Sequence, residues 1–293
     1  MKNQVGFVGL GAMGLRMARN LAIQRKVVGY DVATRSIAED GITPANSVAE
    51  VGAACDTVCL SLPNSEAVEE VVLGRDGLAA AMGPGGMITD LSTTEPRVSI
   101  RLARELAAMR ISFADAPVSG GVSGAEQGTL SIMVGVSEKD FQRILPILEH
   151  FGSRVVRVGE VGAGGVAKLA NNMIVGAAFA SIAESFAMAE KAGIEAKKLY
   201  EAIREGWAGS PVLDTSAIAM IAKDYSPKGT VQMLAKDLNY ARDFAKSSHI
   251  PLPVTSVVQE ILTAAEAVGL GGNSQAAILE LWRPAIDGKK PEV

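Results

Sequence analysis

The sequence predicts an α/β domain followed by an all-helical domain, and three observations lead to this assignment. First, 293 residues with 48% hydrophobic content are enough for two domains, each with its own core. Second, short β-rich runs alternate with helical patterns in the first half of the chain. Third, strand patterns nearly vanish after about Gly164, where long Ala-rich helical patterns take over. We therefore expect two domains, at residues 1–162 and 163–293, with the boundary in a cluster of glycines.

The first half contains several candidate strands with helical patterns between most of them. This alternation is typical of a mainly parallel sheet with helices on both faces. The predicted strands lie at residues 5–9, 26–31, 57–62, 86–91, 111–117, 130–135 and 154–159. The predicted helices of the second half lie at residues 164–193, 195–205, 230–248, 252–268 and 274–282.

Charge and composition narrow the class of protein. The net charge is −4, the pI is near 5.4, and no run of Lys or Arg would follow a phosphate backbone, so we expect no nucleic-acid partner. No 18 consecutive apolar residues occur, which predicts no membrane partner, and the first residues lack a clear signal-peptide cleavage site. Cys55 and Cys59 lack the partners of a metal site and are predicted to be reduced core residues. We expect no metal and a cytoplasmic location.

A glycine-rich hexapeptide follows the first predicted strand and matches the G-x-G-x-x-G pattern. Its residues are Gly9, Leu10, Gly11, Ala12, Met13 and Gly14. Gly9 permits a tight turn, Gly11 lets the backbone approach a pyrophosphate, and Gly14 allows helix and sheet to pack closely. The amides at the start of the following helix can then bind the diphosphate. The hexapeptide is therefore predicted to bind a dinucleotide cofactor.

An acidic residue ends the second predicted strand and bears on the choice of cofactor. Asp31 lies 20 residues after Gly11, where a carboxylate can accept hydrogen bonds from the hydroxyls of the adenosine ribose. Its charge would repel a 2′-phosphate, so the sequence favours NAD over NADP. Arg35 leaves NADP open, because a guanidinium at this distance could reach a 2′-phosphate if the loop folds back.

A second glycine-rich segment, DAPVSGGVSGAEQGT at residues 115–129, follows another predicted strand. Its composition predicts a loop with many free backbone amides, which suits either an anion site or a flexible connector. The loop leaves the carboxyl end of a strand, where open α/β sheets bind their ligands. We therefore predict that Ser119, Gly120 and Gly121 bind a small carboxylate.

One lysine and two adjacent asparagines interrupt the apolar run GGVAKLANNMIVGAAF at residues 164–179. A helix that is apolar all round is normally buried, so we expect Lys168 in a buried wall rather than on the surface. Asn172 lies one turn further along the same side of the helix. Burial lowers the pKa of a lysine, so Lys168 is a candidate for the acid and base that hydride transfer at a hydroxyl carbon requires. Asn172 would orient the substrate or the ammonium.

Four motifs, GLGAMG, DAPVSGG, GAGGVAKLANN and AKDL, together resemble those of the β-hydroxyacid dehydrogenases and occur in the order expected for that family. The resemblance runs from Val5 to about Trp282. It implies an amino-terminal Rossmann domain, an all-helical carboxyl-terminal domain joined through a long interdomain helix, and an active site in the cleft between them.

The resemblance also implies roles for individual residues. The family's catalytic lysine falls on Lys168 and its asparagine on Asn172, and its substrate-binding serine and glycines fall on the three residues predicted above to bind a carboxylate. The residues that correspond to the family's further cofactor contacts are Leu62, Pro63, Thr93 and Lys236.

Within the family, residues 62–78 and 207–214 look most like the tartronate semialdehyde reductases. We therefore expect hydride transfer between NAD(H) and a small 3-hydroxy acid or its semialdehyde, with tartronate semialdehyde as the first candidate. A 3-hydroxyisobutyrate dehydrogenase is the alternative enzyme, and 6-phosphogluconate is a poorer substrate candidate because no arginine cluster is obvious. A non-catalytic dinucleotide-binding module is the alternative of a different class, although such family members lack the lysine. The apolar helical half predicts a homodimer or homotetramer.

Overall fold

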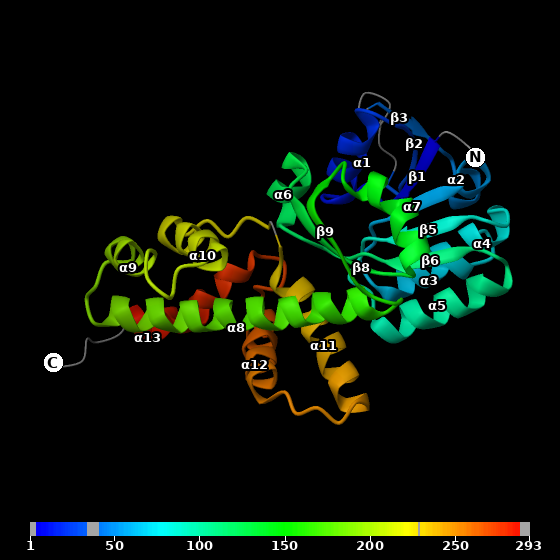
Figure 1. Ribbon diagram of the computed structural model, residues 1–293. Helices are drawn as coiled ribbons and strands as arrows, with labels where there is room; N and C mark the ends of the chain where they lie inside the picture. Colours follow the sequence, from blue (N-terminus) through cyan, green and yellow to red (C-terminus); the bar gives the residue numbers. More distant parts are fainter. Residues whose placement is uncertain (1–3, 34–40, 228, 288–293) are drawn as a thin grey trace. The chain divides into compact units, whose positions relative to one another are not determined.

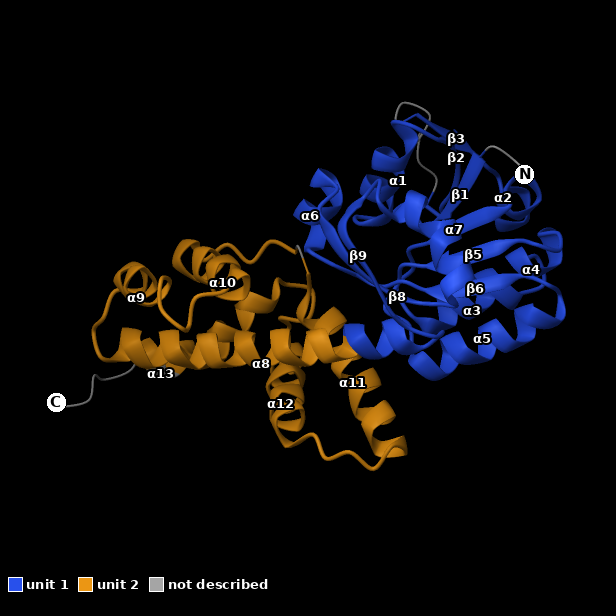
Figure 2. Ribbon diagram, in the orientation of Figure 1, with its two compact units in different colours: residues 1–168 blue, residues 169–293 orange. Residues whose placement is uncertain are grey.

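The computed structural model describes residues 4–33, 41–227 and 229–287. The chain divides into two compact units, residues 1–168 and 169–293, which are coloured separately in Figure 2. The long helix α8, Ala163–Lys191, begins in unit 1 and continues through unit 2. Each unit is described by itself.

Unit 1 is built around one mixed sheet (Figure 1). Its strands are β1 Gln4–Val8, β2 Lys26–Tyr30, β3 Ile42–Pro44, β4 Thr57–Leu60, β5 Met87–Asp90, β6 Ser112–Asp115, β7 Val118–Ser119, β8 Leu130–Gly135 and β9 Gly152–Gly159. The order is β3-β2-β1-β4-β5-β6-β8-β7, with β9 paired to β8. The strands from β3 to β6 run parallel, and β8 is antiparallel to β6 and β7. The parallel part has the strand order of a Rossmann fold, which confirms the predicted fold class.

Helices cover both faces of this sheet, as the alternation of elements predicted. They are α1 Gly14–Ala22, α2 Val48–Ala54, α3 Ser65–Leu73, α4 Leu78–Ala81, α5 Pro96–Ala108, α6 Gly121–Gln127 and α7 Glu138–Leu148. One core joins the sheet to α1, α6 and α7, and a second core joins its other face to α2, α3, α4 and α5. Neighbouring residues of β4 show the two-residue period: Cys59 faces the first core, and Val58 and Leu60 face the second.

The prediction of a loop at residues 115–129 is wrong in part, because the segment contains β7 and α6. Helix α6 is rich in glycine, so its sequence alone favours a loop. A tertiary contact stabilises the helix despite this composition. The side-chain amide of Asn20 on α1 donates to the carbonyl oxygen of Ala125 at 2.7 Å. This bond satisfies a carbonyl at the end of α6.

Unit 2 is helical. Besides most of α8, it contains α9 Ala196–Ile203, α10 Pro211–Ala222, α11 Val231–Ser247, α12 Pro253–Ala267, the 3₁₀ helix η2 Gln275–Trp282 and α13 Arg283–Asp287. One apolar core joins α8, α10, α11, α12 and η2. Helix α10 was not predicted, and the helix predicted at residues 274–282 is the 3₁₀ helix η2.

Helix α8 is less buried than its apolar composition suggested. Ile174 is 73% exposed and Met188 is 72% exposed. Within the described part of the chain, α8 is the one helix long and apolar enough to cross a membrane, judged by length and composition alone. The core helix of a protein outside membranes passes the same test.

Candidate active site

The nucleotide loop connects β1 to α1, and two glycines shape it. Gly9 has a φ of +90°, a conformation that glycine adopts without strain. A Cβ on Gly9 would lie 2.2 Å from the carbonyl oxygen of Ser61, and a Cβ on Gly14 would lie 1.9 Å from the carbonyl oxygen of Gly9. Both distances are far below van der Waals contact, so the packing of the loop itself requires these two glycines.

Gly11 differs from these two glycines because the packing does not require it. A Cβ there would meet no atom within 4 Å among the described residues. Helix α1 begins beside this open space, and the side chain at its N-cap position, Met13, makes no capping hydrogen bond. An open cradle at the positive end of a helix fits the diphosphate of a dinucleotide.

The other members of the hexapeptide have different surroundings. The side chain of Leu10 is fully buried in the core, so this residue offers only its backbone to a ligand. Met13 packs against the same core and is half-buried, whereas Ala12 is exposed. The surface available to a cofactor along this loop is therefore mainly backbone.

Asp31 follows β2, and its carboxylate accepts two backbone amides. Oδ2 accepts from the amide of Leu10 at 2.6 Å, and Oδ1 accepts from the amide of Ala33 at 2.8 Å. The first bond ties the end of β2 to the nucleotide loop. A carboxylate has about four lone-pair positions, so Asp31 keeps capacity for a ribose hydroxyl. Arg35, which left NADP open, lies outside the described residues.

The predicted cofactor contacts Leu62, Pro63 and Thr93 lie at the carboxyl ends of two neighbouring strands, β4 and β5. The two connections are joined, because the amide of Leu62 donates to Ser92 Oγ at 2.8 Å. The buried carboxylate of Asp90 accepts from the amide of Ser92 at 3.0 Å. Leu62 and Thr93 are half-buried and Pro63 is exposed on this edge of the sheet, where open α/β folds bind ligands.

The predicted carboxylate-binding residues lie at the junction of β7 and α6 rather than in an open loop. Ser119 pairs with Ser131 of β8 and is half-buried. Gly120 and Gly121 have φ angles of +131° and +62°. A Cβ on Gly121 would meet no described atom within 4 Å. The segment is therefore more ordered than predicted, but Gly120 and Gly121 remain exposed.

Lys168 lies on α8 and is half-buried, so the expectation of a fully buried wall is wrong. Val166, Ala170 and Ile174 on the same helix are exposed, because the single chain covers only part of this helix surface. A lysine at such a position can contact both substrate and water.

Asn172 is buried and ties α8 to α11 within unit 2. Its Nδ2 donates to Oδ2 of Asp237 at 2.6 Å, and Oδ1 of Asp237 lies 3.0 Å from the ammonium of Lys236. This ammonium also lies 4.8 Å from the ring centroid of Tyr240, in cation–π geometry. Two predicted site residues thus share one carboxylate. Sequence reasoning missed Asp237, whose one signal was its place in the AKDL motif.

A second buried carboxylate attaches the start of α8 to the end of β6. Asp115 is 2% exposed and accepts from the amides of Gly162 at 2.8 Å and Gly165 at 2.6 Å. Burial raises the pKa of Asp115 to about 7, the two amide bonds oppose this shift, and the charge of Asp90 adds to it. Sequence reasoning gave Asp115 no role, because its partners are 47 and 50 residues away.

The cysteines and histidines form no comparable cluster. Cys55 and Cys59 are reduced and buried, as predicted, and burial raises the pKa of Cys59 to about 12. Burial and the charge of Arg25 lower the pKa of His150. In the described ranges, no group of three or more His, Cys, Asp or Glu could hold a metal ion.

Family models match the chain in two consecutive parts. Residues 4–159 match the NAD binding domain of 6-phosphogluconate dehydrogenase. Residues 162–282 match a model described as the NAD-binding part of NADP-dependent 3-hydroxyisobutyrate dehydrogenase. Together they indicate a nicotinamide dinucleotide cofactor.

Several proteins are similar over nearly their whole length. The 2-(hydroxymethyl)glutarate dehydrogenase of Eubacterium barkeri is 34% identical, over 95% of this chain and 94% of that protein. The 2-hydroxy-3-oxopropionate reductase of Escherichia coli K12 is 34% identical, over 94% of this chain and 96% of its own. The crystal structure of 3-hydroxyisobutyrate dehydrogenase from Salmonella typhimurium has a TM-score of 0.88 at 30% identity, covering 95% of this chain and 99% of that one.

These comparisons confirm the resemblance that the four motifs indicated, and with it the fold and the class of cofactor. The chain belongs to the β-hydroxyacid dehydrogenase family and is an NAD(P)-dependent dehydrogenase that acts on a CH–OH group.

Proposed function

We propose that the protein reduces tartronate semialdehyde to glycerate with NADH and catalyses the reverse oxidation. The Escherichia coli relative is named for 2-hydroxy-3-oxopropionate, which is tartronate semialdehyde. The other two relatives are named for 2-(hydroxymethyl)glutarate and 3-hydroxyisobutyrate. All three compounds carry a carboxylate and a hydroxymethyl or aldehyde group on the same carbon. This shared group defines the substrate class that we assign to the chain.

The observation that carries the proposal is the pair Lys168 and Asn172 on one side of α8, with Asn172 held by Asp237. In the reductive direction Lys168 donates a proton to the substrate oxygen, and in the oxidative direction it removes that proton. When bound, the nicotinamide supplies or accepts the hydride. Nδ2 of Asn172 has a second hydrogen besides the one given to Asp237, and this hydrogen orients the substrate oxygen.

The carboxylate of the substrate binds at Ser119 and at the amides of Gly120 and Gly121. Support comes from the positive φ angles of both glycines and from the open space beside Gly121. An anion there lies on the segment that leaves β6, at the carboxyl edge of the parallel strands.

The hexapeptide from Gly9 to Gly14 holds the diphosphate of the cofactor, and Asp31 binds the ribose and favours NAD. The open cradle at Gly11 and the uncapped start of α1 support this placement. The remaining contacts that we assign to the cofactor are Leu62, Pro63, Thr93 and Lys236.

The first test compares initial rates with tartronate semialdehyde, using NADH and NADPH at matched low concentration. Faster turnover with NADH supports both the substrate and the role of Asp31. Equal or faster turnover with NADPH contradicts the cofactor preference. If neither cofactor gives turnover, 3-hydroxyisobutyrate in the oxidative direction is the next substrate, as the Salmonella neighbour suggests.

The second test replaces the proposed acid and base. Lys168→Ala should lose most of kcat and still bind NADH, because the lysine serves proton transfer, a contribution of about 10²- to 10⁴-fold. Lys139→Ala, an exposed lysine on α7, is the matched control and should keep wild-type kcat. Wild-type kcat in Lys168→Ala would reject the assigned role. If the wild type turns over no acid of this class, the alternative of a non-catalytic dinucleotide-binding module is favoured instead.

We also propose that the protein is a homodimer or homotetramer in the cytoplasm. Exposed apolar side chains support an assembly: Ile174 and Met188 on α8, and Val254 and Val257 on α12, are between 62% and 73% exposed. Light scattering coupled to gel filtration would detect a monomer, which would contradict it. Cytoplasmic location stays a prediction that rests on two reduced cysteines.

A further inference from the structure

The first turn of α8 is held by a carboxylate from another strand. Asp115, at the end of β6, accepts from the amides of Gly162 and Gly165 at 2.8 and 2.6 Å. The carboxylate is 2% exposed, so water cannot easily replace either bond. Gly165 precedes Lys168 by three residues, or slightly less than one helical turn. The position of Lys168 therefore follows from the position of this first turn.

Glycines surround Asp115 and let three segments approach closely. A Cβ on Gly135, in β8, would lie 2.4 Å from Oδ1 of Asp115. A Cβ on Gly164, in α8, would lie 2.5 Å from the carbonyl oxygens of both Asp115 and Met133. Gly162 has a φ of +97°. A side chain at Gly135 or Gly164 would thus push the helix away from the ends of β6 and β8.

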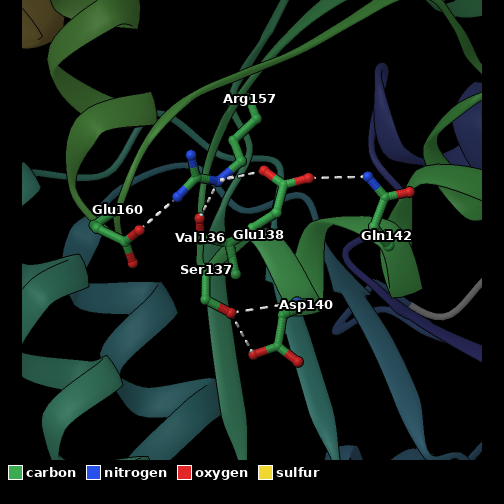
Figure 3. Close-up of polar contacts among 7 residues, drawn as sticks. All are labelled: Val136, Ser137, Glu138, Asp140, Gln142, Arg157 and Glu160. Atoms are coloured by element: carbon green, nitrogen blue, oxygen red, sulfur yellow. Dashed lines mark hydrogen bonds and ion pairs between the residues drawn. The ribbon is translucent and has the colours of Figure 1, made fainter.

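The connection that leads from β9 to α8 is fixed separately, as Figure 3 shows. The guanidinium of Arg157 donates to the carbonyl oxygen of Val136 at 2.8 Å and pairs with Glu160 at 2.5 Å. It also lies 3.6 Å from the carboxylate of Glu138, on α7. These contacts hold the chain as far as Glu160. The two hydrogen bonds to Asp115 then hold the first turn of α8, which follows directly.

Asp115 also begins the segment that we assign to the substrate. Ser119 follows it by four residues, and of the three residues between, Ala116 and Pro117 are buried and Val118 is half-buried. Asp115 is thus connected to the proposed carboxylate site by a short stretch of chain, and to the helical turn before Lys168 by two hydrogen bonds.

We propose that Asp115 is a positioning residue, which sets the register of Lys168 relative to the substrate-binding segment at Ser119. This inference rests on the proposed role of Lys168 in proton transfer. Misplacement of a catalytic group by about 1 Å can cost about 10²-fold in rate. The loss should appear in kcat, because the residues assigned to the cofactor and to the substrate carboxylate keep their own contacts.

Asp115→Asn tests the inference. The variant replaces one acceptor oxygen by an NH₂ group, so one of the two helix amides faces a donor. NADH titration counts the competent sites, and kcat is expressed per site. We expect kcat per site to fall between about 10- and 100-fold, with KM for the semialdehyde and Kd for NADH within about twofold of wild type. A merely structural role would reduce the number of sites and leave kcat per site unchanged.

A control and a second variant make the result decisive. Asp140→Asn, in the first turn of α7, should keep wild-type kcat per site. Gly165→Ala perturbs the same contact between α8 and Asp115, but from the side of the helix. Its Cβ would lie 3.3 Å from Pro96 Cγ and from the carbonyl oxygen of Thr94. It should show a smaller loss with the same split between kcat and KM.

Each outcome decides the matter. Wild-type kcat per site in Asp115→Asn would overturn the inference. If that variant binds no NADH, then wild-type kcat per site in Gly165→Ala would overturn it. Absence of turnover in the wild type, with every substrate of the class, instead rejects the proposed function on which the inference rests.

Discussion

Gly11→Ala separates the ligand-binding role of the nucleotide loop from its packing. The φ of Gly11 is not in the left-handed region, and a Cβ there meets no described atom within 4 Å. The free protein should therefore accept alanine without strain. Gly14→Ala is the matched variant, because its Cβ would lie 1.9 Å from the carbonyl oxygen of Gly9.

The two variants should differ in stability. A Gly→Ala change at a permissive position stabilises by about 0.4 to 1 kcal/mol through the unfolded chain. For a protein of this size that raises Tm by roughly 1 to 4 °C. In Gly14→Ala the loop must move by more than about 1 Å, and overpacking of this kind costs about 1 to 3 kcal/mol. Its Tm should fall by several degrees.

Both variants should bind NADH more weakly. In Gly14→Ala the reason is the displaced loop, and in Gly11→Ala it is the added methyl group. The methyl group of Gly11→Ala occupies the space that we assign to the diphosphate. Losing one hydrogen bond to a charged group costs about 1.5 to 3 kcal/mol, which is roughly a 10- to 100-fold increase in Kd. Fluorescence titration with NADH and differential scanning calorimetry measure the two quantities. Wild-type affinity in a well-folded Gly11→Ala would refute our placement of the diphosphate.

Three further predictions concern buried or half-buried charged groups. Because the pKa of Asp115 is raised from 3.8 to about 7 in the folded state, its protonated form stabilises the protein at low pH, and this contribution is lost as the pH rises through about 7. In urea unfolding, the wild type should lose about 2 to 3 kcal/mol between pH 5 and pH 8 relative to Asp115→Asn; parallel profiles would contradict this. Asp237→Ala removes the acceptor of Asn172 and should lower kcat/KM at least about tenfold, and an unchanged value would exclude Asp237 from the site. Arg283→Ala leaves the carboxylate of Glu190 without its partner at 2.6 Å, so urea unfolding should show a loss of about 2 kcal/mol, whereas an unchanged midpoint would mean that the pair contributes nothing.

The strands of unit 1 could be predicted from the sequence because both faces of the sheet are buried. The runs around Phe7 and Val58 are short and apolar, and turn residues bound them. Strand β3 has three residues and ends in Pro44, so it carries little local signal. Helix α6 escaped prediction because long-range contacts such as that of Asn20 outweigh its poor helix propensity.

Helix α8 was harder to predict for a different reason. Its apolar composition predicted burial around Lys168, yet Ile174 and Met188 are exposed in the single chain. An apolar composition indicates that a helix surface is shielded from water, but it does not indicate what covers that surface. A helix in a subunit interface therefore has the same apolar pattern as a helix in a core. Asp115 and Asp237 were missed for another reason: each acts on residues dozens of positions away, and only the topology brings them together.

Each of these two carboxylates contacts a part of α8 that belongs to its own unit. Asp115 belongs to unit 1 and holds the turn before Lys168, the last residue of that unit. Asp237 belongs to unit 2 and holds Asn172, one turn further on. Loss of Asp115 should therefore act mainly on kcat through the lysine, and loss of Asp237 mainly on substrate orientation through the asparagine.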